Sequence, residues 1–216
     1  MLVAAGRGER LEVDRPKAFA ALLGRPLLAE GLERLDASDW IDAVVVAAPP
    51  AWEEPVILLA EELAADKVAE VVTGGETRTE SVRAAVERVP ADAAAILVHD
   101  AARPLLADSV LERVLAPLGE GWDGAVPVLP VADTIKRVRG DEVVETVDRS
   151  DLVAAQTPQA FVAGRLREAL AREASAATDC AALVEAAGGR IKAVPGDPRL
   201  LKVTEPGDLA LIEALL

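Results

Sequence analysis

The chain has 216 residues, of which 51% are hydrophobic, and this is enough to form one sizeable core. Its formal net charge of −14 argues against a general nucleic-acid binder, and no apolar run approaches the roughly 20 residues that span a bilayer. A single cysteine, Cys180, excludes an intrachain disulfide, which suits the reducing cytoplasm. From the length of the chain we expect one domain over residues 1–216, and we expect it to be cytoplasmic.

The first predicted element is an apolar strand over residues 1–5 that leads directly into the basic glycine turn Gly6–Arg10. Glycine lets the backbone approach anionic oxygens, and Arg10 and Lys17 can then contact phosphates from the side. Leu11 stands where a dinucleotide-binding turn needs its third glycine, and the sequence contains no P-loop string. The alternative is an ordinary turn with solvated arginines. Together with Pro16 and Lys17, the turn favours a nucleoside triphosphate as ligand.

Helical and strand-like patterns alternate through the next hundred residues. In chain order we predict a helix carrying Leu28, Leu32 and Leu35, a strand over 41–47, a helix over 52–65, a strand over 68–72, a helix over 77–89, a strand over 94–99, a helix over 110–118 and a strand over 125–129. Thr77 and Glu80 fit a capping box. Apolar strands separated by amphipathic helices are typical of an α/β fold with a mostly parallel sheet covered on both faces. Ligands of such sheets bind at the carboxyl ends of the strands.

The alternation ends after Pro130. Residues 131–150 are predicted to form a charged hairpin that turns at Gly140-Asp141, and neither strand is long or apolar enough to belong to the core. A two-stranded hairpin alone is marginally stable in water. We therefore expect this arm, at about 131–152, to pack on a second subunit of a homodimer. The alternative is a mobile surface flap.

The C-terminal part is predicted to contain two helices, two strands and a final helix. The helices lie around 165–172 and over 179–187, and the strands over 190–194 and 200–203. Thr204 is expected to cap the last helix, with Pro206 and Asp208 in its first turn.

A carboxylate at a predicted strand end is the first candidate for chemistry. Asp100 lies in the string His99–Pro104, and such a carboxylate commonly holds Mg²⁺ together with phosphates and water. The alternative is an aspartate that caps the following loop. Arg103 could hold a second anion. His99 is the only histidine, and a lone histidine is more often structural than catalytic.

Two positively charged residues in the C-terminal third of the chain complete the set of candidate site residues. Lys202 follows the last predicted strand and Arg149 lies in the predicted arm. A single such charge is usually solvated, so these residues matter only together. Cys180 is a weak alternative nucleophile, because its sequence neighbours offer no cation that would stabilise a thiolate.

The order and spacing of these strings resemble the 2-C-methyl-D-erythritol 4-phosphate cytidylyltransferase family, a Rossmann-like nucleotidyltransferase fold with a protruding hairpin arm. The resemblance runs from residue 3 to residue 204. The strings that carry it are Ala4-Ala5-Gly6-x-Gly8-x-Arg10, Pro16-Lys17, Gly74-Gly75 with Arg78 and Ser81, His99–Pro104, Asp133-Thr134-x-Lys136, Val147-Asp148-Arg149, Thr157-Pro158-Gln159, Thr178-Asp179 and Lys202-Val203-Thr204. Many sugar-phosphate nucleotidyltransferases share the first string, whereas the later ones are more specific. Cys180 stands where the family usually has an acidic residue.

The resemblance implies that CTP and methylerythritol phosphate are joined to CDP-methylerythritol, with release of pyrophosphate, in non-mevalonate isoprenoid synthesis. Mg²⁺ is the implied cofactor. The implied catalytic residues are Arg10, Lys17, Arg149 and Lys202; the nucleotide-binding residues are Ala4, Ala5, Gly6, Gly8, Gly75, Arg78, Ser81 and Ala101; the substrate-binding residues are Asp100, Arg103, Thr134, Arg149, Thr157, Thr178 and Lys202; and the metal ligand is Asp100. The arm is implied to reach across a dimer, so that Thr134 and Arg149 serve the neighbouring site.

Two alternatives to this function stay open at this point. A ribitol-phosphate or other sugar-phosphate cytidylyltransferase has a similar glycine loop. A regulatory subunit that binds CTP without turnover is the alternative from another class, although the sequence retains every implied catalytic cation. The implied reaction needs no general base, because a phosphate with a second pKa of about 6 is largely ionised at pH 7.

Overall fold

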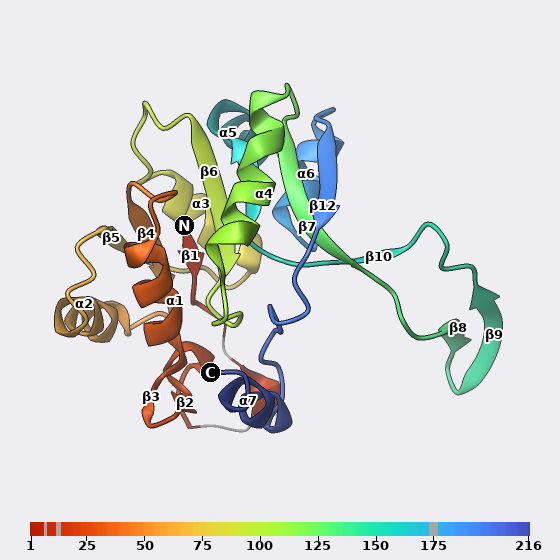
Figure 1. The fold of residues 1–216 in the computed structure, drawn as a ribbon, viewed down its shortest axis with the longest axis horizontal. Coiled ribbons are helices and arrows are strands. Elements are labelled where there is room, and N and C mark those ends of the chain that lie inside the picture. Colours follow the sequence, from red (N-terminus) through yellow and green to blue (C-terminus); the bar gives the residue numbers. More distant parts are fainter. Residues whose placement is uncertain (7, 12–13, 173–176) are drawn as a thin grey trace.

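The structure is a computed structural model that describes residues 1–6, 8–11, 14–172 and 177–216 (Figure 1). Its main sheet has the strand order β10-β7-β11-β6-β1-β4-β5, and β12 pairs with β7. The strands are β1 (Leu2–Val3), β4 (Val44–Ala48), β5 (Val68–Thr73), β6 (Ala95–Asp100), β7 (Gly124–Pro130), β10 (Val153–Ala155), β11 (Gln159–Val162) and β12 (Ile191–Pro195). In this sheet, as far as the structure describes it, only β10 and β11 pair antiparallel with their neighbours, so the prediction of a mostly parallel sheet is confirmed.

Helices cover both faces of this sheet, as the alternating sequence pattern predicts. The helices are α1 (Leu27–Ala37), α2 (Glu53–Glu62), α3 (Arg78–Val86), α4 (Asp108–Gly119), α5 (Ala163–Ala171), α6 (Cys180–Ala186) and α7 (Pro206–Glu213), with short 3₁₀ helices η1 (Glu9–Leu11) and η2 (Lys17–Phe19). On one face α1, α2 and α4 pack on the sheet, and on the other face α3, α5 and α6 do so. Within the described residues, every helix is too short or too polar to cross a membrane.

Local signals set several of these boundaries. The hydroxyl of Thr77 accepts the backbone N–H of Glu80, whose carboxylate accepts the N–H of Thr77 in return, so the predicted capping box begins α3. Asp179 caps α6 by accepting the N–H of Ala182. These bonds satisfy donors that the first turn of a helix would otherwise leave unpaired.

Other boundary predictions are wrong. Residues 200–203 form no strand. Leu200 and Val203 are buried in the core, and the N–H of Val203 donates to Ala102 O at 2.8 Å. The cap of α7 is Glu205 rather than Thr204, whose N–H and hydroxyl both donate to Asp208 Oδ2. The strands β10 and β11 are absent from the prediction because both are short and β11 begins at a buried glutamine, Gln159.

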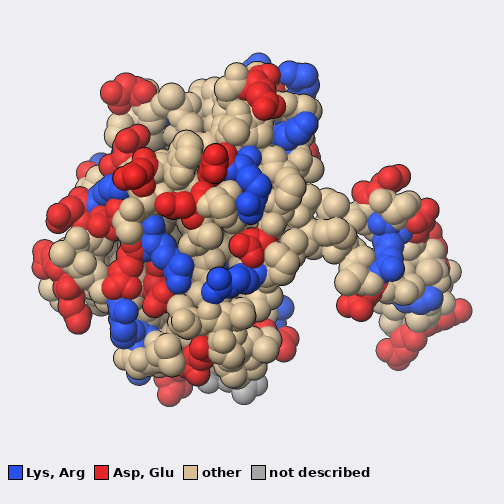
Figure 2. All heavy atoms as spheres, viewed as in Figure 1, with Lys and Arg blue, Asp and Glu red and all other residues tan. Residues whose placement is uncertain are grey.

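The predicted hairpin is confirmed as β8 (Ile135–Arg139) paired antiparallel with β9 (Glu142–Val147). Its turn contains Gly140 at a φ of +59°, a conformation that favours glycine. The arm projects away from the body of the molecule (Figures 1 and 2). Val138, Val143 and Val144 on the arm are 61%, 57% and 41% exposed. The hairpin therefore carries apolar surface that its own chain leaves uncovered.

Candidate active site

A cleft of about 790 Å³ opens at the carboxyl ends of β1, β5 and β6. This is the sheet edge at which the sequence predicts a ligand. The predicted site residues that line it are Ala4, Ala5, Gly6, Lys17, Gly75, Arg78, Ser81, Asp100, Ala101 and Lys202. They come from segments that lie up to two hundred residues apart in the chain, and the fold brings them into one cavity.

Asp100 lies at the centre of the charged part of this cleft. Its Oδ1 accepts hydrogen bonds from Arg78 Nε and Nη2 at 3.1 and 3.0 Å, and its Oδ2 accepts one from Lys202 Nζ at 2.8 Å. Burial by itself raises the pKa of this carboxyl, but the charges of Arg78 and Lys202 outweigh it and hold the pKa below its ordinary value. Asp100 is therefore ionised at any physiological pH, and it holds both cations at the cleft.

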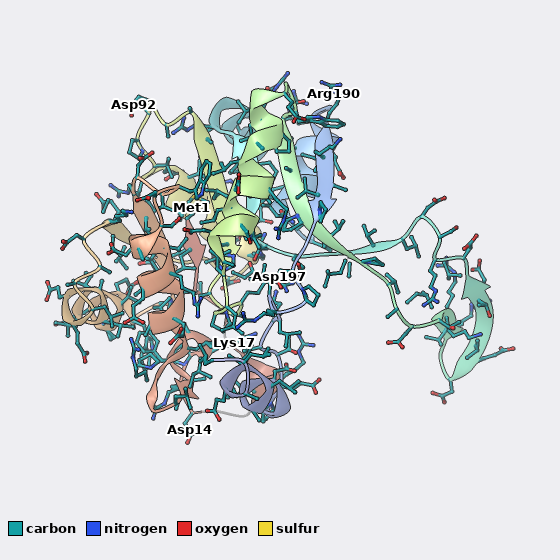
Figure 3. The ribbon with its side chains drawn as sticks, in the orientation of Figure 1. Met1, Asp14, Lys17, Asp92, Arg190 and Asp197 are labelled. Atoms are coloured by element: carbon teal, nitrogen blue, oxygen red, sulfur yellow. The ribbon has the colours of Figure 1, made fainter. Side chains whose placement is uncertain are left out.

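Lys17 provides a further cation in the same cleft, close enough for the charges of Lys202 and Asp100 to affect its pKa. Burial lowers its pKa to about 8, with further lowering by the charge of Lys202, and Asp100 only partly compensates. Gly8 lies against this lysine at a φ of +70°, and a Cβ at Gly8 would be 2.6 Å from Lys17 Cβ. The second glycine of the loop is thus needed both for its left-handed backbone and for its close contact with Lys17. Figure 3 shows Lys17 on the side of the body where α7 lies.

Small residues form the remaining wall of the cleft. A Cβ at Gly74 would be 2.2 Å from Ala5 Cβ, so the loop after β5 packs directly against the first glycine loop. Ser81 Oγ accepts the N–H of Gly75 at 3.1 Å and donates to Thr77 O at 3.0 Å. The wall therefore presents mostly backbone groups, which suits recognition of a flat base by hydrogen bonds.

Several predicted site residues lie outside the cleft lining of the described chain. Arg103 is half-buried and its Nη1 donates to Leu200 O at 2.7 Å. Thr157 is buried beneath Asp100, and Thr178 is exposed beside the N-cap of α6. Arg10 is an exposed member of η1.

Thr134 and Arg149 are at or near the arm rather than at the cleft of their own chain. Both are exposed, and Arg149 Nη1 donates to Val131 O at 3.0 Å and also to Ala132 O. The arm leaves the body well to the side of Lys17 (Figure 3). Neither residue lines the cleft among the described parts of the chain.

The surroundings of Cys180 differ from those predicted from its sequence neighbours. Arg78 Nη1 lies 3.5 Å from its Sγ, so a cation is present that comes from α3, 102 residues away. Burial nevertheless raises the pKa of the thiol, and this effect exceeds that of Arg78. Cys180 is 1% exposed, which argues against a nucleophilic thiolate.

His99 is also buried, and its burial lowers its pKa to about 4. The imidazole is therefore neutral near pH 7. It does not line the cleft among the described residues, which supports a structural interpretation of the only histidine.

The site fits a metal ion that arrives with phosphates rather than one held by the protein alone. The described residues contain no group of three or more His, Cys, Asp or Glu side chains that could hold a metal. Within that part of the chain, Asp100 Oδ2 accepts only the hydrogen bond from Lys202, so it retains a lone pair for another ligand. Mg²⁺ commonly takes one carboxylate together with substrate phosphates and water. A single carboxylate with one open position is consistent with that arrangement.

Comparison with known proteins agrees with this geometry. The sequence profile of the IspD family, 2-C-methyl-D-erythritol 4-phosphate cytidylyltransferase, matches residues 1–216. An enzyme of that description from Saccharopolyspora erythraea is 47% identical over 220 residues, covering 100% of this chain and 97% of the relative. One from Frankia casuarinae is 46% identical, covering 99% of this chain and 79% of the relative.

Solved structures give the same result. The crystal structure of 2-C-methyl-D-erythritol 4-phosphate cytidylyltransferase from Thermus thermophilus superposes with a TM-score of 0.81 at 35% identity, covering 100% of this chain and 97% of that one. Because the match extends over the whole chain and includes the cleft, the chain belongs to the 2-C-methyl-D-erythritol 4-phosphate cytidylyltransferase family and is an enzyme of non-mevalonate isoprenoid synthesis.

Proposed function

We propose that the cleft between the first glycine loop and Asp100 holds CTP and 2-C-methyl-D-erythritol 4-phosphate in line for transfer of the cytidylyl group. The observation that carries the proposal is the convergence of Lys17, Asp100 and Lys202 on one cavity with a wall of small residues. An oxygen of the acceptor phosphate attacks the α-phosphorus of CTP, the bond to the β-phosphate oxygen breaks, and pyrophosphate leaves. The attacking oxygen is already ionised, so no group of the protein must remove a proton.

The main task of the protein in this reaction is to neutralise and align two anions. Lys17 Nζ is proposed to contact the triphosphate and to stabilise the charge that develops in the transition state. Arg10 follows the same loop and is proposed to assist from the solvent side. Lys202, which Asp100 holds at 2.8 Å, is proposed to contact the acceptor phosphate.

The wall of small residues is proposed to hold the cytosine. Ala4, Ala5 and Gly6 leave room for the base, and Gly75 and Ser81 would offer backbone and hydroxyl partners to its edge. Asp100 would bind Mg²⁺ through its open position. The bound metal would neutralise phosphate charge and polarise the α-phosphoryl group.

The arm is proposed to complete the site of a second subunit. Its exposed valines are suited to an interface, and Thr134 and Arg149 lie outside the cleft of their own chain. In a symmetric dimer each arm would carry these two residues to the partner's acceptor site. The proposed assembly is therefore a homodimer with two shared sites.

The choice of substrates tests the proposed reaction directly. Purified enzyme is expected to release pyrophosphate only when CTP, Mg²⁺ and methylerythritol phosphate are present together. We expect kcat/KM for methylerythritol phosphate to exceed that for ribitol 5-phosphate by about tenfold or more, since a site built to bind substrate hydroxyls rejects a poorly fitting analogue. A preference for ribitol 5-phosphate would show that methylerythritol phosphate is not the acceptor substrate. Tight CTP binding without turnover would instead indicate a regulatory subunit.

Mixing two inactive variants tests the shared site. Arg149→Ala is expected to lower kcat by about 10²-fold, because it removes a cation from the acceptor phosphate. Lys17→Ala disables the other half of the site. If Arg149 serves the partner's cleft, refolding the two variants together restores one complete site in each mixed dimer, and activity rises to about a quarter of the wild-type value in a random mixture.

Subunit exchange in that mixture is checked by native mass spectrometry with one variant isotopically labelled. No recovery of activity despite full exchange would show that Arg149 acts in its own chain or not at all. Arg139→Ala, at another exposed arginine of the arm, is the matched control for loss of an arm charge.

A further inference from the structure

We infer that Thr157 and His99 form a buried positioning pair that holds the backbone of the Asp100–Arg103 turn, so that Thr157 supports the site instead of touching a substrate. The inference rests on the proposed function, because the turn matters only if Asp100 takes part in the reaction. It concerns the only histidine of the chain and a threonine that lies outside the cleft lining of the described residues.

Three contacts define the pair. The Thr157 hydroxyl oxygen accepts the backbone N–H of Asp100 at 3.1 Å and lies 3.2 Å from His99 Nδ1. His99 Nε2 lies 3.0 Å from Arg103 O. His99 is 1% exposed and Thr157 is 5% exposed, so water does not compete for these groups. The pair therefore connects the first and last residues of the turn to one buried support.

The positions of the hydrogen atoms determine which group donates and which accepts in each contact. The backbone N–H of Asp100 can only donate, so the hydroxyl oxygen of Thr157 must accept there. The hydroxyl has one proton of its own, and it points to His99 Nδ1, which then carries no hydrogen. The neutral imidazole must carry its hydrogen on Nε2, where it donates to the carbonyl of Arg103. Every donor has one acceptor in this arrangement, and no second arrangement satisfies all of the groups.

The turn that this pair supports carries three functional groups. The Asp100 carboxylate holds Arg78 and Lys202, and Ala101 lines the cleft. The carbonyl of Ala102 accepts the N–H of Val203, next to Lys202. A shift of the turn would therefore move the carboxylate and the segment of Lys202 together.

The pair also connects the turn to the arm. Thr157 lies two residues after β10, the strand through which the chain returns from the arm, and β10 pairs with β7, from which the arm departs. The hydroxyl of Thr157 is thus one point at which the segment after β10 contacts the Asp100 site. A threonine here can support both halves of a shared site.

The test compares Thr157→Val with Thr157→Ser. Valine has the same shape as threonine but leaves the buried N–H of Asp100 without an acceptor, whereas serine keeps the hydroxyl. We expect Thr157→Val to lower kcat by about tenfold or more while the KM for methylerythritol phosphate changes less than about threefold, and Thr157→Ser to stay within about threefold of wild type. A rise in acceptor KM with unchanged kcat would assign Thr157 to substrate binding and overturn the inference.

A double-mutant cycle with Asp100→Asn separates positioning from direct contact. If Thr157 acts through Asp100, Thr157→Val causes little further loss in the Asp100→Asn background, because the two residues act as one unit. If the fold-loss in kcat of the double variant equalled the product of the two single fold-losses, the inference would be overturned. His99→Gln keeps a donor for Arg103 O and removes the acceptor of the threonine proton, so it should show the same non-additivity if Thr157→Val does not fold.

Val114→Ala is the control for loss of stability alone. Val114 is fully buried between α4 and the sheet and packs with Ala125, Ala160 and Val194, none of which belongs to the Asp100–Arg103 turn, so its truncation is expected to lower the melting temperature without moving the turn. Its kcat at a permissive temperature should equal that of wild type. A wild-type enzyme without activity would contradict the proposed function, whereas an active wild type with a normal Thr157→Val variant would contradict only this inference.

Discussion

Lys17→Ala is expected to lower kcat by about 10²- to 10³-fold, as loss of a charge-stabilising donor does in other enzymes. Lys17 is a partly buried cation in the cleft that contains Asp100, and burial makes its charge act through a medium of low polarity. Steady-state pyrophosphate release measures the effect. CTP binding, measured without turnover, should weaken less than kcat falls, because the largest charge develops in the transition state.

The pH dependence provides a second measurement on the same residue. The pKa of Lys17 is lowered to about 8, first by burial and then by Lys202, so the free enzyme loses this charge as the pH rises through about 8. We therefore expect kcat/KM to fall as the pH rises, to reach half of its plateau value near pH 8, and to level off about one pH unit lower. The Lys17→Arg variant, whose guanidinium stays protonated, should lose this limb.

The control for Lys17 is Lys192→Ala. Lys192 Nζ lies 4.8 Å from the ring centre of Trp122, and the residue is absent from the cleft lining within the described chain. Its replacement should leave kcat unchanged. If Lys17→Ala retained more than half of the wild-type kcat, or if the alkaline limb survived in Lys17→Arg, the proposed role of Lys17 would be wrong.

Asp100→Asn is expected to lower kcat by about 10²-fold or more and to raise the Mg²⁺ concentration needed for half-maximal activity. The amide is similar in size to the carboxylate but carries no charge, so Arg78 and Lys202 lose the partner that holds them at the cleft. A titration of activity with Mg²⁺ at saturating CTP measures both effects.

The same substitution should reduce the free energy of unfolding by about 1–3 kcal/mol. Removing one partner of a fully buried ion pair costs about 3–5 kcal/mol. The cost here is smaller because the side chains of Arg78 and Lys202 are 25% and 41% exposed, so water can solvate them. Urea unfolding without substrates measures the change.

Asp66→Asn, at an exposed carboxylate in the turn between α2 and β5, is the matched control. It should alter neither the Mg²⁺ requirement nor kcat. An Asp100→Asn variant with the Mg²⁺ dependence of wild type would remove Asp100 from the proposed metal site.

The fold could be predicted from the sequence wherever the signal is local. The apolar runs before residue 130 mark buried strands because a strand covered on both faces needs apolar residues at successive positions. The capping box at Thr77 and the turn at Gly140 depend on residues within a few positions of each other. The arm could be recognised because its two strands are too polar for the core.

The prediction is wrong where pairing is long-range. The stretch over 200–203 has the apolar character of a strand, yet its backbone contacts the Asp100 turn instead of a sheet neighbour. The strand β11 begins with a polar residue, and the local pattern does not predict it, because its place between β6 and β7 depends on partners more than thirty residues away.

The sequence by itself determined the alternation of strands and helices, the hairpin arm and the strings of residues that mark the family. Each of these features depends on neighbours along the chain or on the identity of single residues. Only the tertiary structure decided that Arg78 and Lys202 share the carboxylate of Asp100, that Arg78 contacts Cys180, and that Thr157 lies beneath the turn. Up to 102 residues separate these partners, and the distance between them in space is set by the packing of the whole sheet.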